Sequence, residues 1–399
     1  MRIGVYLGDI DPTHGGGFTF QDDVFRALIE LDSPGDHEIV VYCNADKDVL
    51  QTYRRPHLEF RPGYRRFRSK AERFLKIWLR DLAFFLNALH ISGAFERRLR
   101  EHRVDFMWFV TPEFAEPGIP FIYTVFDLQH RIQPWFPEVS EYGRWQHREK
   151  SYGDIIPRAF TVITGNEAGR EELMRYYQLP PDRIALLPHP TPLFALRAPI
   201  GSNKDTLSKH GIPDQYIFYP AQFWPHKNHV GLLYAVKVLK DRDGMLIHVV
   251  LSGSDQGNLA HIKQVVGELG LAEQVHFVGF VSRDDLIALY RHAVALVYLT
   301  FFGPENLPPL EAFALGCPVI ASNVPGAEQQ LGDAALLVEG TNELDVADAI
   351  KSLYCEPDLR LSLAKRGRER AAQWTATDYV KAVIGVFDRF QLIRRCWLS

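Results

Sequence analysis

The chain is poor in cysteine, in long apolar segments and in charge of a single sign. Its 399 residues include four cysteines, Cys43, Cys317, Cys355 and Cys396, and no two of them form a Cys-x-x-Cys pair. This scatter argues against a zinc site or a disulfide scaffold and fits a reducing cytosol. Uncharged apolar stretches such as 82–95 are too short to span a bilayer, and the N-terminus resembles a strand rather than a signal peptide. We therefore expect a cytoplasmic, globular protein.

The rest of the composition is ordinary, but the charge is unevenly spread. Hydrophobic residues make up 46% of the chain and charged residues 24%, and the length of 399 residues predicts two domains. The net charge is −4, yet residues 53–103 hold 14 Lys and Arg against 5 Asp and Glu. This basic segment would attract an anionic partner. We expect no nucleic-acid partner.

The most informative stretch is residues 300–320, which read TFFGPENLPPLEAFALGCPVI. A β-prone run precedes it, a turn-rich loop opens it, and Pro308 and Pro309 suit the first turn of a helix. The order strand, loop, helix, strand places the loop and the helix N-terminus at the carboxyl edge of a parallel sheet, where α/β proteins bind phosphorylated ligands. Glu311, about one turn into the helix, can accept hydrogen bonds from vicinal hydroxyls such as those of a ribose.

This stretch resembles the donor-binding signature of family 4 glycosyltransferases, which are retaining enzymes of the two-domain GT-B fold. The resemblance implies that Glu311 binds the nucleotide ribose and that Asn306 and Leu307 belong to the donor loop. Family members have another glutamate, which contacts the transferred sugar, where this chain has Gly303. Glu305 lies two positions out of register, and we expect it to act in the sugar-transfer step.

A glycine-rich turn, DPTHGGG at residues 11–17, connects the first predicted strand to a predicted helix over 18–31. Such a turn lets backbone amides approach a diphosphate closely. Family members have a Gly-Gly loop here that contacts the donor phosphates and the acceptor. The resemblance therefore assigns Gly16 and Gly17 to donor binding; a merely flexible connection is the alternative.

A predicted strand over 121–126 delivers Asp127 at its carboxyl end, followed by His130 and Arg131. Family members often have His-Asp-Leu here, beside the acceptor and the reacting carbon. Asp127 keeps its place while Phe126 replaces the histidine. The resemblance implies that Asp127 orients or deprotonates the acceptor hydroxyl and that His130 and Arg131 lie on the acceptor side. An N-cap role for Asp127 is the alternative.

Residues 216–229, YIFYPAQFWPHKNH, resemble the family segment that holds the donor diphosphate. The family usually has an arginine after this strand and a lysine several residues on. Lys227 matches the lysine, Gln222 replaces the arginine, and His226 or His229 could compensate for the lost charge. Stabilisation of the leaving diphosphate would then fall on Lys227 and backbone amides, so we expect no metal ion and no other cofactor. A surface lysine at a helix start is the alternative.

Strands alternate with helices along the chain, which is typical of doubly wound parallel sheets. The resemblance implies the GT-B architecture, in which two Rossmann-like α/β domains face each other across a cleft. We predict an acceptor-binding domain at residues 1–195, a donor-binding domain at 196–374, and a helix at 375–399 that crosses back to the first domain. Two further loops match family positions at the donor, and this assigns Gly253 and Phe280 to donor binding.

Residues 65–89 combine apolar residues at helical spacing with several Lys and Arg. A basic, aromatic, amphipathic helix either lies on an anionic membrane, where it would guide a lipid-linked acceptor, or packs its apolar side on the core. Both interpretations remain open.

These features predict a retaining, metal-independent glycosyltransferase. It would move a hexose from a nucleoside-diphosphate sugar to a hydroxyl of a glycan or lipid-linked acceptor in surface polysaccharide or glycolipid synthesis, similar to bacterial lipopolysaccharide mannosyltransferases. It would be cytoplasmic, free or peripheral at the inner face of the cytoplasmic membrane. The alternatives are a nucleotide-sugar epimerase of the same fold and a non-catalytic protein that binds a nucleotide-sugar or a glycan.

Overall fold

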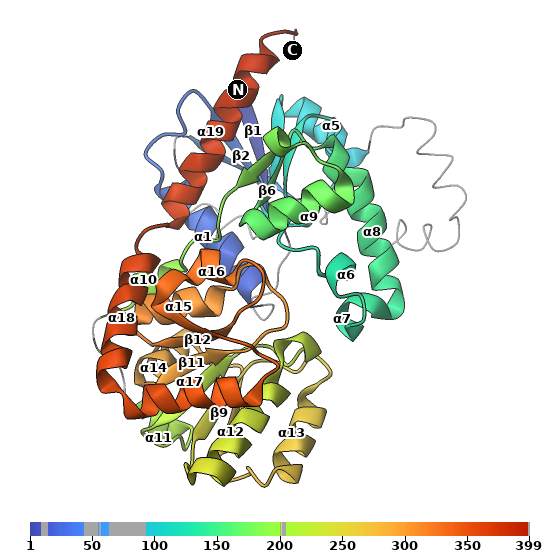
Figure 1. Cartoon of the computed structure of the whole chain (residues 1–399). Helices are drawn as coiled ribbons and strands as arrows, with labels where there is room; N and C mark the ends of the chain where they lie inside the picture. The colour runs from blue at the N-terminus through green and yellow to red at the C-terminus, as the bar shows by residue number, and fades with distance from the viewer. Residues whose placement is uncertain are drawn as a thin grey trace.

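The computed structural model describes residues 1–8, 15–43, 55, 57–63, 93–199, 201 and 205–397. In these ranges the chain folds into two α/β lobes, one above the other in Figure 1. The predicted amphipathic helix at residues 65–89 lies outside the described residues, as does most of the glycine-rich turn before Gly15.

Each lobe is built on a parallel sheet. The strands of the first sheet are β1 (Arg2–Tyr6), β2 (Glu38–Cys43), β3 (Leu58–Pro62), β4 (Phe106–Phe109), β5 (Phe121–Thr124), β6 (Thr161–Thr164) and β7 (Ile184–Leu186). Those of the second are β8 (Tyr216–Pro220), β9 (His248–Ser252), β10 (Val275–Gly279), β11 (Ala295–Tyr298), β12 (Val319–Ser322) and β13 (Ala335–Val338). The spatial orders are β3-β2-β1-β4-β5-β6-β7 and β10-β9-β8-β11-β12-β13, with parallel pairing throughout. Strand order reverses between β1 and β4 and between β8 and β11, and ligands of doubly wound sheets bind at such points.

Helices cover both sheets. In the first lobe they include α1 (Gly16–Glu30), α5 (Ala94–Glu101), α6 (Gln129–Ile132), α7 (Pro137–Ser140), α8 (Arg144–Ile155), α9 (Glu167–Tyr177) and α10 (Leu193–Leu196). In the second lobe they include α11 (Asp205–Lys209), α12 (His229–Asp243), α13 (Leu259–Glu268), α14 (Arg283–His292), α15 (Leu307–Leu315), α16 (Ala327–Leu331), α17 (Glu343–Cys355) and α18 (Pro357–Ala371). The central strands of both sheets are almost wholly buried, as expected for sheets with helices on both faces, whereas the edge strands β3, β7 and β10 are partly exposed.

The last helix, α19 (Ala376–Arg394), leaves the second lobe and runs along the first, so that both chain ends lie at the top of Figure 1. It contacts α1. The ring of Phe390 stacks on Phe106 of β4 with centroids 4.2 Å apart. A capping box at Thr375 and Asp378 fixes the start of this helix. The predicted limits at residues 195 and 374 stay predictions.

Several elements match the sequence-based expectations. The β-prone run before residue 300 is β11, and the helix expected to start at Pro308 and Pro309 is α15. Helix α15 ends at Gly316, whose left-handed conformation (φ 77°) suits glycine. The prediction of two doubly wound parallel sheets is confirmed. Strand β3 was not predicted, because its sequence LEFRP lies in the basic segment and contains a proline.

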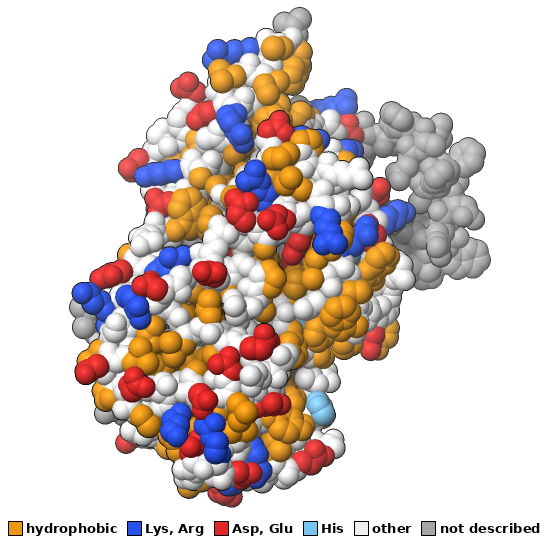
Figure 2. All heavy atoms as spheres, in the orientation of Figure 1, with side chains coloured by type: hydrophobic (Ala, Val, Ile, Leu, Met, Phe, Trp, Pro, Cys, Tyr) orange, Lys and Arg blue, Asp and Glu red, His pale blue; other side chains and the backbone are white. Residues whose placement is uncertain are grey.

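Acidic and basic side chains are interspersed over the face shown in Figure 2, without a continuous field of one sign. No helix in the described ranges is long and apolar enough to cross a membrane.

Candidate active site

Two cavities of about 340 and 320 Å³ lie where the carboxyl ends of the two sheets face each other. They share part of their wall, which is formed by Gly15, Gly16, Pro220, Ala221, Gln222, Leu307 and Pro308. The first cavity also touches Gly17, Asp127, His189, His226, Lys227, Tyr298, Glu305 and Asn306. The second also touches Phe194, Ser252, Gly253, Ser254, Phe280, Arg283 and Glu311. Most of the residues singled out in the sequence therefore converge, although they come from both lobes.

The second cavity contains the carboxylate predicted to bind ribose. Glu311 lies in the first turns of α15, is 8% exposed, and accepts a hydrogen bond of 2.7 Å from the Tyr290 hydroxyl. Burial raises the pKa of Glu311 to about 7, against the opposing effects of the Tyr290 hydrogen bond and the Arg283 charge. A carboxylate held by one donor retains lone pairs for two more hydroxyls.

The first cavity combines one cation with two helix N-termini. Lys227 ends a short 3-10 helix, Pro225–Lys227, and its ammonium lies 5.2 Å from the ring centroid of Tyr298. Lys227 lines this cavity, and within the described ranges no carboxylate lies within 4.0 Å of its ammonium. Helices α1 and α15 both begin at the cavity wall, where their positive dipole ends favour an anion. The start of α1 also presents backbone amides, whereas Pro308 and Pro309 of α15 have none to offer.

Neither neighbouring histidine compensates for the arginine that Gln222 replaces. Burial lowers the pKa of His229 to about 3, and its ring packs between aromatic side chains. Burial and the Lys227 charge lower the pKa of His226, whose Nδ1 is paired with Glu138 of α7. Gln222 lines both cavities and accepts a hydrogen bond of 2.9 Å from the Trp224 indole. The charge compensation expected from these histidines is therefore not supported.

Gly253 lines the second cavity because only glycine fits between two loops there. A Cβ at this position would lie 2.2 Å from the carbonyl oxygen of Ala221, so a side chain would force the β8 and β9 loops apart. The wall shared by the two cavities depends on this close backbone contact.

Glu305 enters the first cavity from the loop before α15 and contacts the other lobe. Its carboxylate oxygens accept hydrogen bonds of 3.0 and 3.1 Å from the backbone amide of His189. A Cβ on Gly165 would lie 1.5 Å from Glu305 Oε2, so the carboxylate occupies space that only glycine leaves free. Burial raises the pKa of Glu305 to about 8, although the His189 amide works in the opposite direction.

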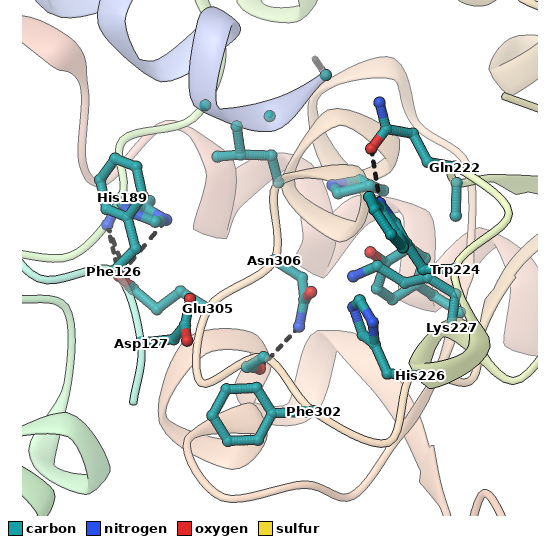
Figure 3. A pocket seen from close by; sticks show the side chains of 18 of the residues that line it. Phe126, Asp127, His189, Gln222, Trp224, His226, Lys227, Phe302, Glu305 and Asn306 are labelled. Carbon is teal, nitrogen blue, oxygen red and sulfur yellow. Dashed lines mark hydrogen bonds and ion pairs between the residues drawn. The ribbon is translucent and has the colours of Figure 1, made fainter. Parts of the chain in front are cut away.

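Asp127 lies across the cavity from Lys227, on the same side as Glu305 (Figure 3). Its Oδ1 accepts hydrogen bonds from Arg148 at 2.6 Å and from the Gln129 amide at 2.9 Å. Burial acts to raise the pKa of Asp127, but Arg148 and this amide outweigh it, and the pKa is lowered. The side chain is an ionised group fixed by an ion pair, which suits orientation of a hydroxyl better than proton abstraction. It also bonds the amide two residues on, as in the capping alternative.

His130 and Arg131 line neither cavity. His130 is fully buried and its Nε2 lies 3.2 Å from Glu149 of α8, while Arg131 pairs with the same carboxylate. The short helix α6 turns both side chains towards α8, where both pair with Glu149. Their predicted place on the acceptor side stays a prediction.

Sequence reasoning missed several residues at the cavities, among them Arg283, Phe194 and His189. Arg283 and Phe194 line the second cavity, and His189, the donor to Glu305, lines the first. Arg283 lies only three residues beyond Phe280, which the sequence did mark. His189 and Phe194 lie before the second sheet, and no local pattern indicates that they return to the cavity wall. No group of three or more potential metal ligands occurs among the described residues.

Residues 203–370 match the family model described as "Glycosyl transferases group 1". They form a group 1 glycosyltransferase domain. This domain contains β8 to β13 together with Lys227, Glu305 and Glu311. The family resemblance predicted from residues 300–320 is thus confirmed for this part of the chain.

Curated proteins similar to this chain are named as glycosyltransferases. An O-antigen chain mannosyltransferase B from Escherichia coli is 30% identical over 243 residues, 60% of this chain and 63% of that protein. A D-inositol 3-phosphate glycosyltransferase from Paenarthrobacter aurescens is 27% identical over 286 residues, 67% of this chain and 69% of that protein. The chain thus spans about two thirds of the length of these relatives.

Solved structures share the fold over nearly the whole chain. HepE from Anabaena, in complex with UDP and glucose, is similar with a TM-score of 0.71 at 15% identity, covering 98% of this chain and 100% of that one. A glycosyltransferase from Rickettsia africae has a TM-score of 0.69 at 14% identity, covering 97% and 98%. At these identities the likeness concerns the fold, and the predicted GT-B architecture is confirmed.

Proposed function

We propose that the protein is a glycosyltransferase that moves a hexose from a nucleoside-diphosphate sugar to an acceptor hydroxyl. The observation that carries the proposal is the position of Glu311 and Lys227 in adjoining cavities whose shared wall contains Gly16 and the start of α15. Glu311 could accept hydrogen bonds from the ribose of a nucleoside diphosphate, and Lys227 could pair with its phosphates. The group 1 domain and the names of its relatives support the same chemistry.

The positions of Glu311 and Lys227 predict how the donor would be oriented across the two cavities. The nucleoside would occupy the second cavity with its ribose on Glu311, and the diphosphate would lie along the shared wall. The sugar would then reach the first cavity, between Lys227 on one side and Asp127 and Glu305 on the other, as Figure 3 arranges them. The reacting carbon would thus face residues from both lobes.

Departure of the nucleoside diphosphate places negative charge on its terminal phosphate. The ammonium of Lys227, the amides at the start of α1 and the positive dipole end of α15 would stabilise this charge as it develops. We propose that these groups suffice without a metal ion. Gln222, in place of the arginine, would contribute a hydrogen bond rather than a charge.

On the acceptor side the two carboxyl groups would differ in protonation. The ion pair with Arg148 keeps the pKa of Asp127 low, whereas burial raises the pKa of Glu305 to about 8. An ionised Asp127 would orient the attacking hydroxyl, and a neutral Glu305 would donate a hydrogen bond to the sugar or its leaving oxygen. Transfer with retention of configuration remains part of this proposal.

The acceptor proposed here is a glycan or a lipid-linked glycan of a bacterial surface polysaccharide. Support comes from the O-antigen chain mannosyltransferases of Escherichia coli and Salmonella typhimurium among the relatives. The basic residues 65–89 would let the protein work at the anionic inner face of the cytoplasmic membrane.

The experiment that tests this function has two steps. Thermal shifts with nucleoside diphosphates and their sugars should identify a stabilising donor, because ligands that bind the native state raise its stability. Turnover of that donor is then measured with and without a panel of glycan acceptors. Acceptor-dependent release of nucleoside diphosphate is expected. Donor conversion without an acceptor would instead indicate an epimerase, and binding without turnover a non-catalytic protein.

A further inference from the structure

Arg283 is a charged side chain at the wall of the second cavity. It is the first residue of α14, and its guanidinium carbon lies 5.2 Å from the ring centroid of Phe194, which belongs to the segment between the two sheets. Within the described ranges it makes no hydrogen bond and no ion pair. Its donors are therefore available to a ligand in the cavity.

The surroundings of Arg283 suit a flat, polar ring. Phe280 lines the same cavity with 62% of its surface exposed, and Ser282 already uses its hydroxyl to cap α14. Among the described lining residues only Arg283 and Glu311 have acidic or basic side chains. A nucleoside with its ribose on Glu311 would therefore present its base to exposed aromatic surface and to one guanidinium.

We infer that the second cavity selects a guanine nucleotide, with Arg283 donating two hydrogen bonds to the base. This inference rests on the proposed function, since it assumes that a nucleoside diphosphate occupies the cavity. A guanidinium presents parallel N–H donors and accepts nothing, so it favours a base edge with two adjacent acceptors. Guanine offers that edge through O6 and N7, remote from the ribose.

The other bases fit less well. Adenine places its amino donor beside N7, so one guanidinium donor would face another donor. Uracil separates its two carbonyl oxygens with an N–H group and offers only one acceptor at a time. Cytosine has adjacent acceptors in O2 and N3, but O2 lies next to the glycosidic bond, so that pair faces back towards the ribose. The expected order of affinity is GDP first, with UDP, CDP and ADP behind it.

The test compares binding of GDP, UDP, CDP and ADP to the full chain by calorimetry. GDP should bind tightest, and Arg283→Ala should weaken GDP by about 10- to 100-fold while changing UDP by less than about threefold. A second probe is 7-deaza-GDP, which lacks the N7 acceptor. It should bind the wild type more weakly than GDP and should bind Arg283→Ala as well as GDP does.

Lys263→Ala is the matched control. Lys263 is exposed, lies 5.4 Å from the ring centroid of Phe277 and lines neither cavity, so its loss removes the same charge from the same lobe. It should leave GDP affinity unchanged. Tighter binding of UDP, CDP or ADP, or full GDP affinity in Arg283→Ala, would overturn the inference but leave the proposed function standing. Absence of binding by all four nucleotides would overturn both.

Discussion

Glu311 is the residue on which nucleotide binding depends most directly. A charged acceptor bonded to two ribose hydroxyls contributes on the order of 1.5–3 kcal/mol. Glu311→Ala should therefore weaken donor and nucleoside diphosphate alike by about 10- to 150-fold, measured by calorimetry. Glu305→Ala should spare nucleotide affinity, because Glu305 lines only the other of these two cavities. If Glu305→Ala lost nucleotide binding and Glu311→Ala kept it, then Glu305 rather than Glu311 would be the ribose-binding residue.

Lys227 should matter more for turnover than for binding. The charge on the leaving diphosphate is greater in the transition state than in the bound donor, so the ammonium contributes most there. Lys227→Ala should lower kcat by roughly 100- to 1,000-fold, with a smaller change in nucleoside-diphosphate affinity. Lys237→Ala is a suitable control, since Lys237 pairs with Asp241 on the surface of α12. Full activity of Lys227→Ala would place the phosphate site elsewhere.

The buried carboxyl of Glu305 predicts a pH dependence of stability. Its pKa is raised from 4.5 to about 8, so the folded protein keeps a proton that the unfolded chain releases above pH 4.5. The stability that the protonated group contributes is full below that pH and is lost as the pH rises towards 8. Glu305→Gln cannot ionise and should lack this loss.

The unfolding free energy of Glu305→Gln relative to wild type should accordingly increase between pH 5 and pH 8, by up to roughly 4 kcal/mol. Urea denaturation of the ligand-free proteins at both pH values measures this difference. Buried histidines such as His189, whose pKa is lowered to about 4 by burial, act in the opposite direction below pH 6.5 but are common to both proteins. An equal difference at both pH values would contradict the prediction.

At the scale of elements, the loop from β11 to α15 is held by the first lobe at several points. Gln133 donates a hydrogen bond of 2.9 Å to the carbonyl of Phe301, and Asn166 donates one of 2.5 Å to that of Pro304. With the contact of Glu305 to His189, these bonds fix the loop between the two lobes. The donor loop is therefore shaped by residues that precede the group 1 domain.

Helix α19 is the second element that joins the lobes, and its seating can be tested at Phe390. This side chain is 2% exposed and stacks on Phe106, with Phe160 also in contact. Phe390→Ala should lower the free energy of unfolding by about 3–5 kcal/mol, measured by urea denaturation. Leu392, 62% exposed on the same helix, should tolerate alanine with little change. An unchanged midpoint for Phe390→Ala would show that α19 is not seated on this sheet in solution.

At the scale of the whole molecule, the basic segment predicts attraction to anionic membranes. Binding to vesicles that contain an anionic phospholipid should exceed binding to neutral vesicles and should weaken with added salt. Replacing Arg73, Lys76 and Arg80 together by glutamine should reduce it, as measured by vesicle co-sedimentation. Equal binding to neutral and anionic vesicles would favour the core-packed alternative for residues 65–89.

Local sequence patterns were enough to predict several helices and strands and to locate part of the candidate site. Strand β11, the proline-rich start of α15 and its glycine end follow from short-range sterics and burial, which act within a few residues. Glu311 and Lys227 were singled out because the segments around them resemble the donor-binding segments of family 4 glycosyltransferases. The carboxyl ends of parallel strands must lie at one edge, so their convergence was also predictable.

Only the tertiary structure decided which side chains meet across the lobes. Glu305 bonds the amide of His189, which is 116 residues away, and Arg283 lies over Phe194 from the segment between the sheets. His130 follows Asp127 closely in sequence yet turns into the core, because a single turn of helix sends neighbouring side chains in different directions. Contacts of this kind depend on how the two sheets and their loops pack against each other. The residue pattern within a single segment does not predict that packing.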